Sequence, residues 1–389
     1  MKVVGLFAGI GGFELGFAQA GHETVAICEC WEPAVAVLRA RLPGVPVHPD
    51  VRTLEDLPQD TELLCAGFPC QDLSQAGKTV GIGGERSGLV GEVFRLLERA
   101  AARGRPVPWV VLENVSFMLH LEGGQAMERL VSAAEDLGYR WAYRVVNSLG
   151  WLPQRRERVF FVASREGDPA EVLLGDEARP RPADTRIGGL AHGFYWTEGI
   201  RGLGWAPDAV PTLKNGSSVG IPAPPAILLP GGRVVKPDIR DAERLQGFPE
   251  DWTAPAESVA KRSWRWSLVG NAVTVPVARW LGGRLREPSG YDRERDRPLP
   301  LVGRWPRAAR FDGRHRFAVA INDFPVWRGR PPLAEFLRHP GEELSARATA
   351  GFLARTERSR LRFPAGFREA LRAHLARMSA AEASRLAAE

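Results

Sequence analysis

The sequence is poor in cysteine, and the cysteines that it has are confined to its beginning. Among 389 residues there are 4 cysteines, and none follows Cys70. These cysteines are too few, and too confined to the beginning of the chain, to form a disulfide framework. Cys28 and Cys30 form a close pair, but no second Cys or His pair stands at ligand spacing, so we expect no metal site.

Long apolar runs and lysine are also scarce. No stretch approaches the roughly 20 apolar residues of a membrane-spanning helix, and residues 1–5 lack the arrangement of a signal peptide. We therefore expect a cytoplasmic protein with no membrane partner. Only 5 of the 52 basic residues are lysines, and the net charge is +6. An arginine-rich, positively charged chain permits a polyanionic partner without requiring one.

Short apolar stretches alternate with helical patterns in the first part of the chain. We expect buried strands over residues 2–7, 24–28, 63–67 and 109–112. Strands that alternate with helices predict an α/β fold with a doubly wound, mostly parallel sheet. Ligands bind such sheets at the carboxyl ends of the strands, where Glu29, Cys70 and Glu113 are expected.

The pattern changes after about Ser164. Residues 166–240 are dense in Gly and Pro and predict irregular β structure, a helical pattern returns over residues 266–281, and the end of the chain is Arg- and Pro-rich before it becomes helical. We therefore expect three parts: a first domain of residues 1–165 completed by 263–286, a smaller irregular domain of 166–262, and a partly helical extension of 287–389.

Cys70 lies where a nucleophile would be placed. It follows an apolar strand and the sharp turn Gly67-Phe68-Pro69, and it precedes a polar, Gly-rich stretch that reads as a long functional loop. A lone cysteine is more often a buried small hydrophobe. On this stretch alone the second interpretation is favoured.

A glycine turn between the first strand and the first helix suggests a cofactor. Residues 7–12, Phe-Ala-Gly-Ile-Gly-Gly, are shorter than the dinucleotide fingerprint and carry no basic residue for a pyrophosphate, so a nucleoside-type cofactor without phosphates fits better. Glu29 could hold ribose hydroxyls, and Asp50 could accept a hydrogen bond from an adenine amino group. Either carboxylate is equally well explained as a solvated loop residue.

Together these stretches resemble the cytosine-5 DNA methyltransferase family. The sequence blocks that carry the resemblance, all in the family's order, are Phe7–Phe13, Glu29, Asp50, Gly67–Gln71, Ser87–Leu89, Glu113–Val115, Gln154–Arg158, Arg244–Pro249 and Gly270–Val273. The resemblance covers residues 1 to about 285 and implies a Rossmann-like methyltransferase domain, a target recognition domain within 166–262, and S-adenosylmethionine as the methyl donor.

The resemblance also implies the residues of the cofactor pocket. The expected cofactor-binding residues are Phe7, Ala8, Gly9, Ile10, Gly11, Gly12, Glu29, Cys30, Trp31, Asp50, Val51, Pro69, Leu89, Asn271 and Val273. Cys30 is a departure, because some members have Trp directly after the acidic residue, whereas Trp31 comes second here. Trp31 is equally well explained as a core aromatic.

Carbon 5 of cytosine is a poor nucleophile, so its methylation needs prior activation of the ring. A Cys70 thiolate that adds to carbon 6 makes carbon 5 able to attack a sulfonium methyl group. Glu113, protonated when it acts, is the expected acid at nitrogen 3. Arg158 is expected to hold the carbonyl at carbon 2, as the resemblance implies, and Arg156 to hold a phosphate or the loop. The base that removes the carbon-5 proton is not evident.

The reactive atoms are inaccessible inside a duplex, so the target base must be flipped out. Gln71 and Ser74, in the loop after Cys70, are expected to contact DNA. Thr212 and Lys214 are expected to meet the duplex from the recognition domain. Double-stranded DNA is therefore the expected partner, read at a specific short sequence that cannot be derived.

Alternatives remain for the substrate and the setting. A tRNA cytosine-5 methyltransferase shares the scaffold, but that subfamily resembles Pro-Pro-Cys-Gln at the nucleophile and carries a later cysteine. A catalytically inactive DNA-binding regulator is a second alternative. We expect a prokaryotic restriction-modification or phage-defence setting, with a restriction endonuclease or defence complex as a further partner and a monomer acting on nucleoid DNA.

The extension beyond residue 287 lies outside the resemblance. Four of its arginines stand among aromatic residues, a mixture suited to phosphate contact: Arg304, Arg307, Arg310 and Arg314. The alternative is a helical cap packed by the face of Phe367, Leu371 and Leu375.

Overall fold

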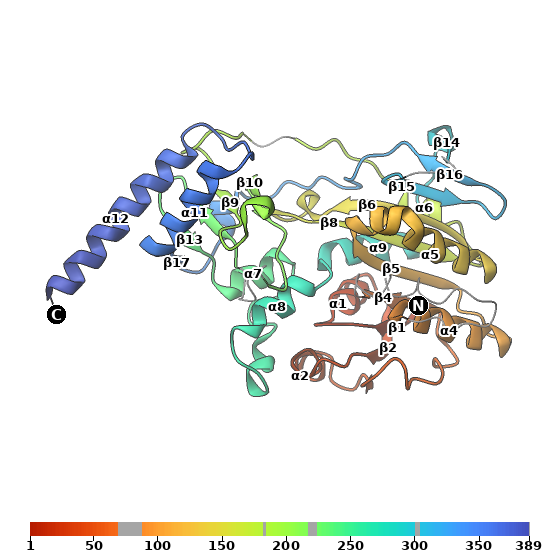
Figure 1. The fold of residues 1–389 in the computed structure, drawn as a ribbon. Coiled ribbons are helices and arrows are strands. Elements are labelled where there is room, and N and C mark those ends of the chain that lie inside the picture. The colour runs from red at the N-terminus through yellow and green to blue at the C-terminus, as the bar shows by residue number, and fades with distance from the viewer. Residues whose placement is uncertain (69–87, 182–183, 217–223, 300–303, 389) are drawn as a thin grey trace. The chain divides into compact units, whose positions relative to one another are not determined.

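The computed structural model describes residues 1–68, 88–181, 184–216, 224–299 and 304–388 (Figure 1). The chain divides into two compact units. The first unit comprises Met1–Gly150, Glu157–Arg179 and Ala272–Trp327, and the second comprises Trp151–Arg156, Pro180–Asn271 and Arg328–Glu389. Within the described residues no helix is both long and apolar enough to cross a membrane.

The first unit is built on one large sheet with helices on both faces (Figure 1). Its strands are β1 (Lys2–Leu6), β2 (Glu23–Cys28), β3 (Val47–His48), β4 (Leu63–Ala66), β5 (Trp109–Val115), β6 (Arg140–Asn147), β8 (Glu157–Ser164), β14 (Asp296–Pro298), β15 (Ala308–Phe311) and β16 (Arg316–Val319). Its helices are α1 (Gly12–Gln19), α2 (Glu32–Arg41), α4 (Leu89–Ala102), α5 (Gln125–Asp136), α6 (Pro169–Leu173) and α9 (Val275–Arg286), with a 3-10 segment η1 (Ser116–Gly124).

The sheet confirms the predicted doubly wound architecture. The spatial order is β14-β16-β15-β6-β8-β5-β4-β1-β2-β3. Strands β3, β2, β1, β4 and β5 are parallel, and β8 enters antiparallel between β5 and β6. The carboxyl ends of the five parallel strands therefore meet at one edge, which is where ligands bind in such sheets.

Side-chain alternation along the strands gives the sheet two buried faces. Leu64, Val110 and Leu112 pack on one face against residues of α4 and α5. On the other side α1 lies against α9, and a Cβ added at Gly16 would stand 2.5 Å from the Cβ of Ala278. Only glycine permits this close approach.

The first part of the extension belongs to this sheet. β15 pairs with β6, and β16 and β14 follow in order. Arg310 is buried and ion-paired with Asp296, and Arg307 is ion-paired with Asp323 and Glu157. These two arginines are therefore engaged by carboxylates of the same unit in this structure, rather than presented to a phosphate.

The second unit consists of short strands and of helices. Its strands are β7 (Gln154–Arg155), β9 (His192–Phe194), β10 (Trp205–Pro207), β11 (Val210–Pro211), β12 (Ala226–Leu228), β13 (Val234–Lys236) and β17 (Glu342–Glu343). Its helices are α7 (Ile239–Leu245), α8 (Trp264–Asn271), α10 (Leu333–Phe336), α11 (Ala346–Arg358) and α12 (Phe367–Ala388), with a 3-10 segment η4 (Ala254–Ser258). A five-stranded sheet has the order β10-β9-β12-β13-β17.

The last part of the extension packs on this small sheet. Phe352, Phe367 and Leu371, from α11 and α12, share a buried cluster with Phe194 and Leu228 of the strands. The helical pattern expected over residues 266–281 is two helices, α8 and α9. Pro276 explains the interruption, because proline is tolerated in the first turn of a helix and not in its interior.

Candidate active site

The glycine turn connects β1 to α1 in an unusual backbone conformation. Phe7, Gly9 and Gly11 all have positive φ, at 54°, 57° and 85°. The turn is closed by a hydrogen bond of 2.9 Å from the Gly11 N–H to the Ala8 carbonyl. Among the described residues, no atom comes within 4 Å of a Cβ added at Gly9. The turn is therefore open on the Gly9 side, where a ligand could approach the backbone.

Glu29 joins the end of β2 to this turn. Its Oε2 accepts a hydrogen bond of 2.7 Å from the Gly9 N–H, and its Oε1 accepts one of 2.8 Å from the Trp31 N–H. Burial raises the pKa of Glu29, and the backbone donors of Trp31, Gly9 and Cys30 oppose that rise. The carboxylate thus holds the open turn in place, and its oxygens lie where a ribose could also be bound.

Glu14 is a second acidic residue at the turn, which the sequence reasoning did not single out. Its side chain is buried, and no hydrogen bond reaches either carboxyl oxygen among the described residues. A Cβ added at Gly5 of β1 would stand 2.0 Å from Oε1, so the carboxyl group occupies the space of a missing side chain. Burial raises the pKa of Glu14 to about 7, and the charge of Glu29 adds to the effect.

Asp50 begins a turn that is fixed from two sides. Its carboxylate accepts hydrogen bonds from the side chain and backbone N–H of Arg52, which lowers the pKa of Asp50. Arg95 of α4 donates to the carbonyls of Val51 and Leu54, at 3.0 and 2.8 Å. An adenine amino group would therefore share the Asp50 carboxylate with Arg52.

Glu113 and Arg158 lie side by side at the end of the sheet. They come from the neighbouring strands β5 and β8, and Arg158 Nε lies 3.0 Å from Glu113 Oε1. A Cβ added at Gly67 would stand 3.7 Å from Glu113 Oε2. The carboxylate therefore faces the turn that leads into Cys70, and its side chain is only 9% exposed.

Asn114 holds the segment after β4 in place, and the sequence analysis gave it no role. Its Nδ2 donates a hydrogen bond of 3.0 Å to the Phe68 carbonyl, and its Oδ1 accepts one of 2.8 Å from the Val115 N–H. Both Asn114 and Phe68 are buried. The position next to Glu113 was the signal that could have identified it, because the same strand end places Glu113 and the segment that follows β4.

Val273 lies beside both Gly12, at the end of the glycine turn, and Gly67, which follows β4. A Cβ added at Gly12 would stand 2.5 Å from the Val273 carbonyl oxygen, and one added at Gly67 would stand 3.6 Å from Val273 Cγ2. The structure thus brings the expected residues Gly12 and Val273 together. Asn271 belongs to the second unit and is exposed, and Leu89 begins α4 of the first unit.

Arg156 is buried in the second unit. Its Nη1 donates to the carbonyls of Leu213 and Gly270, both at 3.1 Å. Thr212 donates its hydroxyl to the Arg155 carbonyl at 2.9 Å. In this structure Arg156 therefore holds protein carbonyls, whereas the sequence reasoning assigned it to a phosphate or to the loop.

Lys214 is partly exposed beside an aromatic ring. Its Nζ lies 3.1 Å from Glu198 Oε1 and 3.9 Å from the centre of the Tyr195 ring. Its own backbone leaves no room for a side chain at Gly270, because an added Cβ would stand 2.2 Å from the Lys214 carbonyl. The residues of this loop are thus fixed by the unit itself.

Two buried glutamines explain why distant sequence blocks belong together. Gln154 Nε2 donates to the Leu245 carbonyl at 2.9 Å and to Gln246 Oε1 at 3.0 Å, and Gln246 in turn donates to the Val269 carbonyl. Gln154 Oε1 accepts from the Leu213 N–H. Both glutamines lie within blocks that carry the family resemblance, Gln154–Arg158 and Arg244–Pro249, and the sequence alone assigned neither a role.

Four predicted site residues lie outside the described residues: Pro69, Cys70, Gln71 and Ser74. Within the described residues, no group of three or more His, Cys, Asp and Glu side chains could hold a metal ion. The open turn at Gly9 and the two acidic strand ends, by contrast, fit a nucleoside-type cofactor.

Comparison with known proteins identifies the family to which this chain is similar. The profile of the C-5 cytosine-specific DNA methylases matches residues 1–199. The chain is 46% identical over 367 residues to the Type II methyltransferase M2.BsuMI of Bacillus subtilis (strain 168), which covers 92% of this chain and 94% of that protein. It is 28% identical over 316 residues to the Type II methyltransferase M.Bsp6I of Bacillus sp. (strain RFL6), with 72% and 96% covered.

Among solved structures, the S. pombe Dnmt2 methyltransferase has a similar fold, with a TM-score of 0.52 at 16% identity over 74% of this chain and 98% of that one. This likeness concerns the fold alone. The sequence matches carry more, since one family profile spans half of the chain and a relative matches nearly its whole length. The chain therefore belongs to the C-5 cytosine-specific DNA methylase family and is an enzyme of that family.

Proposed function

We propose that the protein methylates carbon 5 of cytosine within a specific short sequence of double-stranded DNA, with Cys70 as the covalent nucleophile. The observation that carries this proposal is the position of Glu113, which faces Gly67 of the nucleophile turn while Asn114 holds the Phe68 carbonyl. An acid and a nucleophile turn fixed by the same strand end are what addition to a cytosine ring needs.

S-adenosylmethionine is the proposed cofactor, and it supplies an electrophilic methyl group. The residues that would hold it are the open turn of residues 7–12, with Glu29 at the ribose, Asp50 at the adenine, and Val273 closing the pocket beside Gly12. Cys30, Trp31, Val51, Pro69, Leu89 and Asn271 complete the proposed set. The glycine turn has no basic side chain, which suits a cofactor without phosphates.

The chemistry follows from the residues in order. The Cys70 thiolate forms a bond to carbon 6 of the flipped-out base, and the displaced electron pair moves through the ring, so that nitrogen 3 takes a proton from Glu113. Carbon 5 then accepts the methyl group. The bond between the methyl group and the donor's sulfonium sulfur would break, which leaves a neutral thioether. Loss of the carbon-5 proton to water, release of the thiolate and return of the nitrogen-3 proton to Glu113 restore the ring. No step requires a metal or an oxidant.

Arg158 has two tasks in this scheme. In the structure its Nε lies 3.0 Å from Glu113, and a neighbouring cation stabilises an ionised carboxylate. To act as an acid Glu113 must be protonated, so we propose that the carbonyl at carbon 2 of the base takes over Arg158. Arrival of the base would then free Glu113 to carry a proton to nitrogen 3.

The setting is proposed from the relatives' names. Both sequence relatives are named Type II methyltransferases, so we propose a restriction-modification role with a cognate restriction endonuclease as a partner. The segment 166–262 would read the DNA sequence, with Thr212 and Lys214 among its contacts, and Gln71 and Ser74 would contact the flipped base. We propose that one copy acts on DNA in the cytoplasm.

Cys70→Ala and DNA containing 5-fluorocytosine test the nucleophile together. Fluorine cannot leave as a proton does, so wild type should form a denaturation-resistant protein–DNA adduct that requires the methyl donor. Cys70→Ala should form no adduct and should not methylate DNA, while it still binds DNA. Methylation by Cys70→Ala would refute the mechanism.

Bisulfite sequencing of DNA from cells that express the protein would report the recognised sequence. Binding of DNA without any methylation by wild type would instead support an inactive regulator, and methylation of tRNA alone would support the other alternative.

A further inference from the structure

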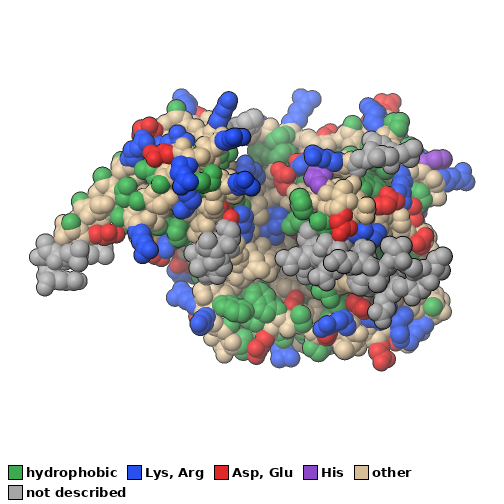
Figure 2. All heavy atoms as spheres, viewed as in Figure 1, with side chains coloured by type: hydrophobic (Ala, Val, Ile, Leu, Met, Phe, Trp, Pro, Cys, Tyr) green, Lys and Arg blue, Asp and Glu red, His purple; other side chains and the backbone are tan. Residues whose placement is uncertain are grey.

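Net charge does not identify a DNA-binding surface on this protein. On the face seen in Figure 2, Lys and Arg side chains are interspersed with Asp and Glu side chains. Many of the arginines are ion-paired, as Arg307 and Arg310 are. Cations that are free to meet a phosphate must therefore be found individually, from their neighbours.

The segment between α7 and α8 exposes both apolar and basic side chains. Val259 is 43% exposed and Trp264 is 45% exposed, and they are two of the three large hydrophobic residues exposed among the described residues. Lys261 and Arg262 lie between them and are exposed as well. We name residues 259–264 the basic turn.

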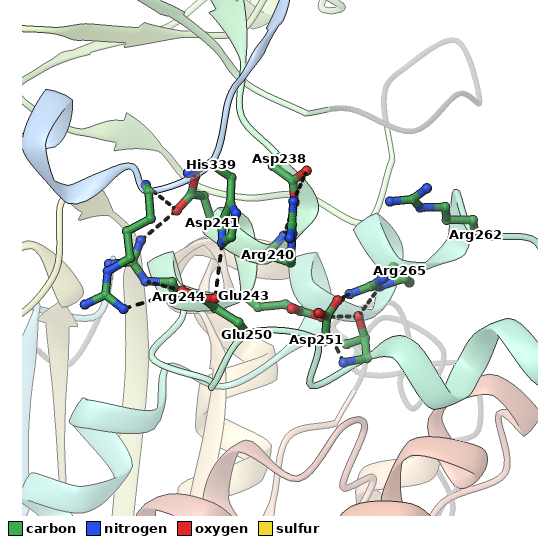
Figure 3. Close-up of polar contacts among 12 residues, drawn as sticks. Asp238, Arg240, Asp241, Glu243, Arg244, Glu250, Asp251, Arg262, Arg265 and His339 are labelled. Atoms are coloured by element: carbon green, nitrogen blue, oxygen red, sulfur yellow. Dashed lines mark hydrogen bonds and ion pairs between the residues drawn. The ribbon is translucent and has the colours of Figure 1, made fainter.

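Arg265 directly follows the basic turn and is held in place by three carboxylates. It is buried, and its guanidinium contacts Glu243, Asp251 and Glu257 at 3.0, 3.0 and 2.8 Å (Figure 3). The backbone of the turn is also fixed, since the Trp264 N–H donates to the Lys261 carbonyl at 2.9 Å. The turn is therefore a preformed surface feature.

The acidic residues of the same segment contact mainly cations outside the basic turn, although Glu257 also lies 3.8 Å from Arg262 Nε. Asp251 and Glu257 are taken by Arg265, and Glu250 lies 3.6 Å from Arg244 and 3.2 Å from His339.

Lys261 and Arg262 take little part in these ion pairs. Arg262 Nε lies 3.8 Å from a Glu257 that Arg265 already holds, and Arg262 is 73% exposed. Within the described parts of the chain, no carboxylate lies within ion-pair distance of Lys261. The turn thus presents Lys261, which has no carboxylate partner among the described residues, and Arg262, which is mostly exposed and shares its carboxylate with Arg265.

The geometry points to the basic turn as a contact surface for the phosphate backbone of the DNA substrate, with Lys261 and Arg262 on phosphates and Trp264 beside them. This inference rests on the proposed function, which supplies the DNA duplex as substrate. Two exposed cations on a fixed turn complement a polyanion, and Trp264 belongs to the same turn. Such contacts position the duplex without reading its sequence.

The salt dependence of DNA binding tests the inference in the full-length protein. Each phosphate contact contributes about 0.9 to the slope of log affinity against log salt. The double variant Lys261→Gln, Arg262→Gln should therefore show a slope about 1.8 shallower than wild type. Between 50 and 200 mM salt, the variant should lose about 12-fold less affinity than wild type does. Its preference for the target sequence over other DNA should be unchanged.

A matched control removes the same charge from the same unit. Arg347 and Arg358 are exposed residues of α11, and Arg347→Gln, Arg358→Gln should keep the wild-type slope. Lys261→Gln alone, which breaks no ion pair, should reduce the slope by about 0.9 even if the double variant folds poorly.

Equal slopes for the turn variants and the α11 control would overturn the inference, whereas failure of wild type to bind DNA would overturn the proposed function instead. Concentration-dependent association of wild type that Trp264→Ala abolishes, with the slopes equal, would assign the turn to a second copy of the chain.

Discussion

Each unit of the protein buries a glutamate beside an arginine, and the two pairs differ in what surrounds them. In the second unit Glu243 Oε1 accepts from the backbone N–H and hydroxyl of Thr253 as well as from Arg265. Arg265 also contacts carboxylates of its own unit (Figure 3). In the first unit Glu113 lies near the end of β5, and its carboxylate faces Gly67.

The surroundings of each pair indicate whether the glutamate and arginine stabilise local structure or lie at a ligand-binding edge. A buried pair whose members are held by several protein partners fixes local structure, because removing one member leaves an uncompensated charge. A pair at the carboxyl edge of a parallel sheet lies where ligands bind. We therefore expect substitutions of Glu113 or Arg158 to change the rate of methyl transfer, and substitutions of Glu243 or Arg265 to change the free energy of unfolding.

The largest expected effect is on catalysis by Glu113→Gln. The amide keeps the shape of the side chain but cannot deliver a proton to nitrogen 3, so the rate of methyl transfer should fall by about 10²- to 10⁴-fold. The midpoint of thermal unfolding should change little. Single-turnover kinetics would measure the rate, with Glu128→Gln on the surface of α5 as the control. An unchanged rate would remove Glu113 from the chemistry.

Arg265→Ala should act in the opposite way. It leaves Glu243 buried without its cation, and breaking a buried pair typically costs about 3–5 kcal/mol of unfolding free energy. Denaturant titration would measure the loss, and Arg262→Ala, three residues away and exposed, should change the free energy of unfolding by less than about 0.5 kcal/mol. Similar losses in the two variants would contradict the scaffold role.

Glu14→Gln tests a buried carboxyl group that lacks a partner. The pKa of Glu14 is about 7 in the folded chain, above the usual value of about 4.3, so the folded state binds the proton more tightly than the unfolded state. The stability of wild type relative to the variant should fall between about pH 4.5 and 7 and then stay constant, by up to about 3 kcal/mol. Thermal unfolding of both proteins at pH 5 and 8 measures this, and a pH-independent difference would be the contrary result.

The smallest effect is expected for Asp50→Ala. Loss of one hydrogen bond to a charged group should weaken binding of the methyl donor by about tenfold. DNA binding should not change, because Asp50 is placed at the cofactor. Calorimetry with the donor would measure the affinity, and Asp60→Ala, which breaks only the exposed pair with Lys2, is the control. Donor affinity equal to that of the control would exclude Asp50 from the pocket.

Much of the first unit could be predicted because its signals are local. The strands expected near residues 2–7, 24–28, 63–67 and 109–112 are found as β1, β2, β4 and β5. Apolar runs of strand length between glycine turns leave few other arrangements. Glu29 and Glu113 follow from the same pattern, because a residue at the carboxyl end of a parallel strand must lie at the binding edge.

The extension beyond residue 287 could not be predicted in the same way. Its arginines and aromatics look alike in sequence whether they face a phosphate or a carboxylate. Only the pairing of β15 with β6 and the ion pair of Arg310 with Asp296 show that part of it completes the large sheet. The partner of a charged side chain is set by residues distant in sequence, as Arg156 also shows with Gly270.

The sequence by itself determined the strand order along the chain, the glycine turn and the family to which the blocks belong. These depend on residue type and spacing over a few positions, and the positive φ angles at positions 9 and 11 of the turn favour glycine there. Tertiary structure alone decided that Glu14 fills the space beside Gly5, that Gln154 binds Gln246, and that Arg265 contacts three carboxylates while Lys261 contacts none of those in the described residues. Burial and charge pairing are properties of neighbours in space, and folding brings those neighbours together from positions that are far apart along the chain.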